Sequence, residues 1–162
     1  MKKSKQSGFS LIELLIVVAI ILIIAAIAIP NLMASKMAAN ESSAVQQTRA
    51  ITTAEVVYTT QYNIGFASAL TNLGDAGGCG TGAVTSTNAC LIDSVLAAGS
   101  KGGYSFTYAP LNPDAATHYQ SFTLNANPLN PGRSGRKYFF TDQTAVIRMN
   151  LTAAATISDP AI

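Results

Sequence analysis

An unbroken apolar run at residues 14–29 constrains this chain more than any other feature. With the apolar residues just before it, the run approaches the roughly 20 residues that an α-helix needs to cross a bilayer. One acidic residue, Glu13, lies at its start. An ionised carboxylate in hydrocarbon costs at least about 2.5 kcal/mol unless it has a partner. The segment therefore requires lipid or sister helices around it, and we expect the chain to assemble through Glu13.

The basic N-terminus followed by an apolar stretch also fits an ordinary secretory signal peptide. Such peptides end in a small-residue cleavage site after about 7 to 15 apolar residues, whereas this run continues through Ile29 into a polar, helix-like region. Positive charge precedes the run at Lys2, Lys3 and Lys5, and Lys36 is the only near cation after it. Because positive charge stays on the cytoplasmic side, we expect one spanning helix with a cytoplasmic N-terminus.

Residues 8–13, with the sequence GFSLIE, resemble the class III signal of type IV pilins and related pseudopilins. This resemblance covers roughly residues 1–62. It implies that a prepilin peptidase cleaves between Gly8 and Phe9 and that the new amino group of Phe9 is methylated. It also implies that Glu13 pairs with the Phe9 amine of a neighbouring subunit in a helical filament. Pro30 corresponds to the helix-kinking proline of the family.

Elementary electrostatics supports the same pairing. Cleavage after Gly8 would create a cationic terminus one helical turn from Glu13, and at low dielectric a charge pair strongly outcompetes either ion alone. Each subunit would then carry one donor and one acceptor, and such a head-to-tail arrangement propagates as an open filament when rotation does not close it. The alternative is a single-pass protein whose Glu13 reaches the cytoplasmic interface.

The sequence predicts an α+β fold, in which a long N-terminal helix packs on an antiparallel sheet of about four strands. Residues 31–62 contain no Gly or Pro, which favours helix beyond Pro30. A helix over residues 9–62 would be about 81 Å long. We read Pro30 as a kink in it, the alternative being a helix boundary at the membrane exit. Apolar residues at three- and four-residue steps predict a packing face, made of Met33, Met37, Val45, Ile51, Tyr58 and Tyr62.

Five segments follow along the chain. They are a leader at residues 1–8, a transmembrane and assembly helix at 9–29, an amphipathic helix at 30–62, a connecting loop at 63–103, and a sheet with a C-terminal tail at 104–162. Alternating and β-prone residues predict strands at 104–108, 119–124, 137–141 and 145–149. Residues 135–148 are also similar to the C-terminal strand pair of many pilins from Gram-negative bacteria.

The connecting loop is rich in Gly, Thr, Ser, Asn and Ala, with one short helix predicted at residues 91–98. Its glycine-rich stretch at 74–82 lacks the Lys followed by Ser or Thr of a phosphate-binding loop, so we expect no cofactor there. Cys79 and Cys90 predict a disulfide, because exported compartments are oxidising. Two free thiols or half a metal site are the alternatives, although no His or further Cys nearby completes a zinc site.

Charge and composition give little support to nucleic-acid binding. Removing residues 1–8 takes away three of the ten basic residues, which leaves seven against eight acidic ones. The apparent basicity therefore belongs to the leader. The remaining cations are scattered except for Arg133, Arg136 and Lys137, which predict a solvated loop or a subunit contact.

Catalytic and metal sites are not expected either. His118 is the only histidine, and nothing around it in the sequence indicates a catalytic triad, so we expect a surface histidine and no enzyme. Asp142 and Asp159 lack the dense acidic loop that calcium requires.

The resemblance implies the major structural subunit of a type IV pilus. Such a subunit would first be held in the inner membrane as a precursor. The prepilin peptidase would process it, and the pilus assembly machinery would then join it to identical subunits in a retractable surface filament. Twitching motility, adhesion or DNA uptake would belong to the filament. The first alternative is a pseudopilin of type II secretion, and the second is a monomeric membrane-anchored binding protein.

Overall fold

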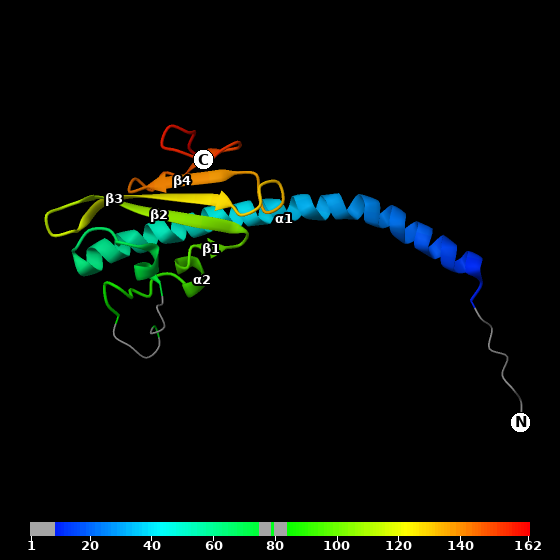
Figure 1. The fold of residues 1–162 in the computed structure, drawn as a ribbon, viewed down its shortest axis with the longest axis horizontal. Coiled ribbons are helices and arrows are strands. Elements are labelled where there is room, and N and C mark those ends of the chain that lie inside the picture. Colours follow the sequence, from blue (N-terminus) through cyan, green and yellow to red (C-terminus); the bar gives the residue numbers. More distant parts are fainter. Residues whose placement is uncertain (1–8, 75–78, 80–83) are drawn as a thin grey trace, which may run out of the picture. The chain divides into compact units, whose positions relative to one another are not determined.

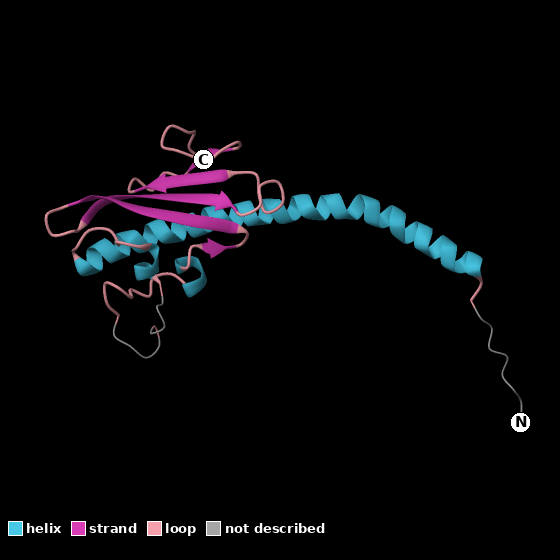
Figure 2. Ribbon diagram, viewed as in Figure 1, coloured by secondary structure: helices cyan, strands magenta, loops and turns pink. Residues whose placement is uncertain are grey.

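A computed structural model describes residues 9–74, 79 and 84–162. The predicted leader with Gly8, and most of the glycine-rich stretch, lie outside the described residues. The elements in chain order are α1 (Leu11–Tyr62), the 3-10 helix η1 (Leu70–Leu73), α2 (Ser94–Ala97), β1 (Ser100–Lys101), β2 (Tyr104–Pro113), β3 (Tyr119–Pro128), β4 (Tyr138–Asp142) and β5 (Arg148–Asn150) (Figures 1 and 2). A long N-terminal helix and an antiparallel sheet confirm the α+β prediction.

The chain divides into two units, with the boundary between Lys36 and Met37. Helix α1 contributes to both. The second unit holds the sheet, both short helices and the C-terminal part of α1. The division into five segments made from the sequence stays a prediction.

The sheet is a meander in which every strand pairs antiparallel with its neighbours in sequence, in the order β1-β2-β3-β4-β5. It has five strands where about four were expected. The additional strand, β1, forms because Gly102 and Gly103, with φ of 60° and 80°, make a two-residue turn that places Lys101 opposite Tyr104. Two consecutive positive φ angles are what a tight hairpin turn of this kind requires.

One face of the sheet packs on the second half of α1 (Figure 2). The shared core contains Ala44, Ile51, Ala54 and Tyr58 of the helix together with Tyr104, Phe106, Phe122, Leu124 and Phe139 of the sheet. The predicted helix face is confirmed at Met37, Ile51 and Tyr58, which are buried, and Val45 and Tyr62 pack at its margin. It is wrong at Met33, which is 41% exposed.

Strands β2 and β3 are longer than the sequence suggested. The first strand was expected to end at residue 108, but Pro110 lies within β2 opposite Phe122, and pairing continues to Pro113 and Tyr119. Proline is tolerated here because β1 pairs only with the first two residues of β2, so the rest of that edge needs no backbone donor.

Strand β5 begins later than the predicted 145–149. The Asp142 carboxylate accepts a hydrogen bond from the backbone N–H of Thr144 at 2.9 Å, and Ala145 adopts a φ of 60°. This turn occupies the residues expected to start the strand, which therefore begins at Arg148.

The connecting region is held together internally by backbone pairing and by the predicted disulfide. Cys79 and Cys90 are bonded, with their Cα atoms 5.7 Å apart. Next to the bridge, the backbone N–H of Leu91 donates to Leu73 at 2.7 Å and that of Ala89 donates to Asn72 at 2.8 Å. The short helix is present as α2, whose first turn is capped by the Asp93 side chain.

Candidate assembly segment

Helix α1 begins with a capping arrangement around Ser10 and Glu13. The backbone N–H of Ser10 donates to Glu13 Oε2 at 2.9 Å. Ser10 immediately precedes the helix and Glu13 is its third residue, which is the spacing of a capping box. The positive end of the helix dipole also favours a carboxylate in the first turn. Glu13 therefore has a structural partner within its own chain before any second subunit is considered.

The helix after Glu13 presents an apolar surface without a covering layer in the single chain. Large apolar side chains from Leu11 to Leu32 are about half to four-fifths exposed, and Phe9 is 89% exposed. Within the described residues, α1 is the one helix long and apolar enough to cross a membrane. Glu13 is the only ionisable side chain between Phe9 and Ser35. Such a surface is stable only in lipid or against other apolar helices.

Pro30 lies inside α1 rather than at its end, because helix is continuous from Leu11 to Tyr62. The helix therefore passes the position where a boundary was the alternative. A proline at this place removes one backbone donor from the helix. Its role as a kink stays a prediction.

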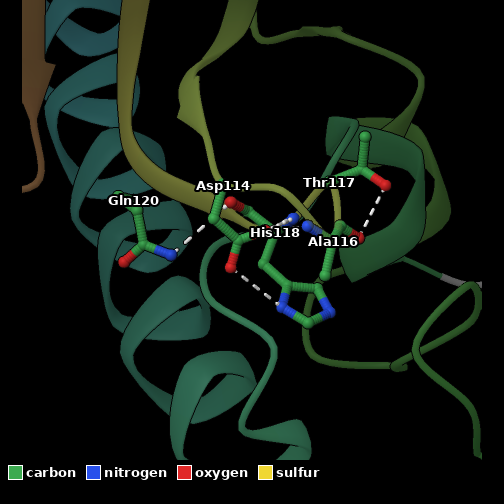
Figure 3. Close-up of polar contacts among 5 residues, drawn as sticks. All are labelled: Asp114, Ala116, Thr117, His118 and Gln120. Carbon is green, nitrogen blue, oxygen red and sulfur yellow. Dashed lines mark hydrogen bonds and ion pairs between the residues drawn. The ribbon is translucent and has the colours of Figure 1, made fainter.

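His118 forms an ion-pair geometry with Asp114 in the β2–β3 connection (Figure 3). His118 Nδ1 lies 3.2 Å from Asp114 Oδ2, and the backbone N–H groups of Ala116 and His118 each donate to Asp114 Oδ1 at 2.8 Å. The backbone N–H of His118 is the main cause that lowers the pKa of Asp114. The Asp114 carboxylate thus holds the β2–β3 connection together through hydrogen bonds. His118 lies at the surface, as expected.

The two aspartates considered for calcium are engaged in turns. Asp142 accepts hydrogen bonds from Thr144, and Asp159 accepts from the Thr156 backbone at 2.7 Å and from Asn150 at 2.8 Å. The hydrogen bond from Thr156 is the main cause that lowers the pKa of Asp159. Across the described part of the chain, no three His, Cys, Asp or Glu side chains are grouped so as to hold a metal ion.

The basic cluster near residue 135 is attached to helix α1. Lys137 Nζ lies 3.3 Å from Glu41 Oε2, and the Arg136 backbone N–H donates to Glu41 Oε1 at 2.9 Å. Asn40 of the same helix donates to the Ser134 carbonyl at 2.8 Å. Part of the cluster is therefore bound to α1 of the same chain through Glu41, which the sequence alone did not indicate.

Two acidic residues have roles that sequence reasoning missed. The cap formed by Glu13 follows from a recognisable signal, a Ser three residues before a Glu at the start of an apolar run. Glu55 is fully buried in the core, and its position on an otherwise ordinary helix gave no such signal.

Comparison with known proteins finds a family match in the N-terminal part of the chain. Residues 3–29 match the family model described as the prokaryotic N-terminal methylation motif. The chain is 40% identical over 58 residues to the type II secretion system core protein G of Aeromonas hydrophila, which covers 36% of this chain and 41% of that protein. The chain thus spans less than half the length of this relative. No solved structure matches the chain.

The matched residues include the capped start of α1 and the exposed apolar run up to Ile29. Residues 3–29 of this chain therefore carry a prepilin-type N-terminal methylation motif.

Proposed function

We propose that this chain is a structural subunit that polymerises through α1, and specifically the major pilin of a type IV pilus. The observation that carries the proposal is the exposed apolar helix with a single carboxylate in its first turn, directly after the expected cleavage site. The chain acts by assembly in this proposal, not as an enzyme. It is held in the inner membrane as a precursor and is then transferred to a surface filament by the assembly machinery.

The assembly contact joins Glu13 to the Phe9 amine of a neighbouring subunit. Within the chain, the Ser10 backbone N–H donates to Glu13 Oε2. A carboxylate has a second oxygen that can accept from another donor. A free amine at Phe9 would lie beside the positive end of the α1 dipole, so a nearby carboxylate lowers its electrostatic cost. In this proposal Glu13 serves its own helix and the adjacent subunit together.

Two substitutions at Glu13 separate these roles. Glu13→Gln keeps an oxygen that accepts from the Ser10 N–H but removes the charge, whereas Glu13→Ala removes both. We expect both variants to be processed and inserted but to form at least about tenfold fewer filaments, because the lost partner is a charge in an apolar bundle. Electron microscopy of filaments sheared from cells measures this. Normal filament numbers in Glu13→Gln would contradict a charge-based contact and leave only the cap.

The second candidate is a pseudopilin of a type II secretion system, favoured by the similarity to the Aeromonas hydrophila core protein G. Deletion of the gene distinguishes the two. Loss of surface filaments and twitching with secretion intact supports the pilin. Loss of exoprotein secretion with filaments intact supports the pseudopilin. Normal function of Glu13→Ala without assembly would instead favour a monomeric membrane-anchored binding protein.

A further inference from the structure

Glu55 is a carboxyl group in an apolar core, outside the assembly segment. It lies on α1 between Ile51 and Tyr58 with none of its surface exposed, and Ile51 and Tyr58 are part of the same core. An ionised carboxylate in such surroundings is costly unless it is fully hydrogen-bonded or paired with a cation. The contacts around Glu55 therefore indicate its protonation state.

The hydrogen bonds around Glu55 leave one oxygen without a donor. The backbone N–H of Ala67 donates to Glu55 Oε2 at 3.0 Å, and the Tyr108 hydroxyl donates to the Ala67 carbonyl at 2.8 Å. Glu55 Oε1 has no hydrogen-bond partner. Tyr108 has a single hydroxyl proton, so it cannot serve the Ala67 carbonyl and Glu55 at once.

A proton on Glu55 Oε1 removes this deficit. The Tyr108 hydroxyl interacts with the Glu55 carboxyl, and its oxygen can accept a hydrogen bond while its proton stays on Ala67. The three residues would then form a closed ring in which Glu55 donates to Tyr108, Tyr108 to Ala67, and Ala67 to Glu55. All polar groups of the ring have a hydrogen-bond partner at the same time only when the carboxyl is neutral.

The charged and titratable neighbours favour the same state. The groups that interact electrostatically with Glu55 are Tyr58 on its own helix and Tyr108 on β2, and both are neutral phenols at physiological pH. Burial is the main cause that raises the pKa of Glu55, and it outweighs the lowering of that pKa by the contacts with Tyr108 and the Ala67 N–H.

The ring joins three pieces of the second unit. Glu55 belongs to α1, Tyr108 to β2, and Ala67 to the segment that follows α1. The same segment contacts β3, because the backbone N–H of Phe66 donates to Tyr119 at 2.9 Å. We propose that Glu55 is a protonated acid in the folded protein and fastens this segment to α1 and β2, and that its ionisation releases the segment. The proposal goes beyond filament assembly and does not depend on it.

Linkage gives the direction of the pH effect. The pKa of Glu55 is higher in the folded chain than its ordinary value of 4.5. Below that value the carboxyl is neutral in both states. As pH rises above it, the unfolding equilibrium constant increases by up to tenfold per pH unit, until the pH passes the pKa of the folded state.

Carbon-13 labelling of the glutamate side chains tests the protonation state directly. The chain has three glutamates, Glu13, Glu41 and Glu55, so the full chain in detergent gives three carboxyl signals. Glu55→Gln identifies the Glu55 signal by its loss. We expect that signal at the carboxylic acid position at about pH 7. A signal at the carboxylate position would overturn the proposal.

Thermal unfolding of the full-length variants tests the consequence. Glu55→Gln supplies an N–H donor and an oxygen acceptor without a titration, so its melting temperature should exceed that of the natural chain at about pH 8 and approach it at about pH 4. Glu41→Gln is the matched control, because Glu41 lies on the same helix, accepts from the Arg136 backbone N–H and forms an ion pair with Lys137. This variant should show no such gain. A less stable Glu55→Gln at about pH 8 would show that the ionised form is the native one.

Hydrogen exchange tests the release of the segment. At each pH above neutrality, the Ala67 amide should exchange faster in the natural chain than in Glu55→Gln. Equal Ala67 exchange in the two proteins would contradict release on ionisation.

Discussion

The carboxylate of Glu41 accepts a hydrogen bond from the backbone N–H of Arg136 at 2.9 Å, across 95 residues of sequence. Lys137 adds an ion pair to the same carboxylate at 3.3 Å. Helix α1 thereby holds the loop that leads from the end of β3 to the start of β4.

Removal of this carboxylate should weaken the second unit. Glu41→Ala leaves the Arg136 N–H and the Lys137 ammonium without their partner, and we expect a loss of about 2 kcal/mol. Lys137→Met should cost less than about 1 kcal/mol, because a partly exposed ion pair contributes little. Thermal unfolding followed by near-ultraviolet circular dichroism measures both. Equal losses in the two variants would mean that the ion pair, not the backbone contact, dominates.

Gly65 and Gly132 form a matched pair for testing backbone constraint. Both have φ near 80°, but a Cβ on Gly65 would overlap the carbonyl oxygen of Tyr119, whereas one on Gly132 meets nothing within 4 Å. Gly132→Ala should cost about 1 kcal/mol from backbone strain alone. Gly65→Ala should cost about 3 kcal/mol, since overlap is added to strain. Similar melting temperatures for the two variants would show that the segment after α1 shifts freely.

The disulfide should stabilise the connecting region. Cys79 and Cys90 are 11 residues apart, and closing a loop of this size contributes about 3 kcal/mol in the chain-entropy description. Replacing both cysteines with serine should lower the melting temperature, and reductant should lower that of the natural chain to a similar value. Reductant should leave the double variant unchanged; a further decrease there would point to an effect unrelated to the bridge.

Alkaline pH should destabilise the second unit through its buried tyrosines. Burial is the main cause that raises the pKa of Tyr58, Tyr104 and Tyr108 above the ordinary value of 10.0. Their phenols are therefore favoured in the neutral form when the chain is folded, and the stability they contribute is complete below pH 10.0 and is lost as pH rises above it. In a pH titration followed by phenolate absorbance, a fraction of the tyrosines should ionise above the ordinary pKa, and Tyr104→Phe should reduce that fraction. A single step at the ordinary pKa would refute this prediction.

Patterns with a short range in sequence predicted most of the fold correctly. The alternation of Tyr104, Phe106 and Tyr108 indicated a strand, and the spacing of Met37, Ile51 and Tyr58 indicated a buried helix face. These patterns work because a period of two or of about 3.6 residues places side chains on one face of an element.

The errors arose where contacts distant in sequence decide the outcome. Glu55 is a polar residue on a buried face. Its partners are Ala67 and Tyr108 of β2, and only the tertiary structure reveals them. The extension of β2 past Pro110 depended on how little of that edge β1 occupies. The late start of β5 is an exception, because it is set by a local turn in which Asp142 accepts from the Thr144 N–H two residues away. The Ser10 and Glu13 cap was also missed, although its spacing alone is a recognisable signal.

The sequential order of the five strands has a consequence if the chain is exported as proposed above. Each strand after β1 pairs with the one that immediately precedes it in sequence, so during such export every hairpin could close as soon as its second strand had crossed the membrane. Short loops make such closure fast and entropically cheap. The sheet of such an exported chain could grow one strand at a time, before the C-terminus has crossed.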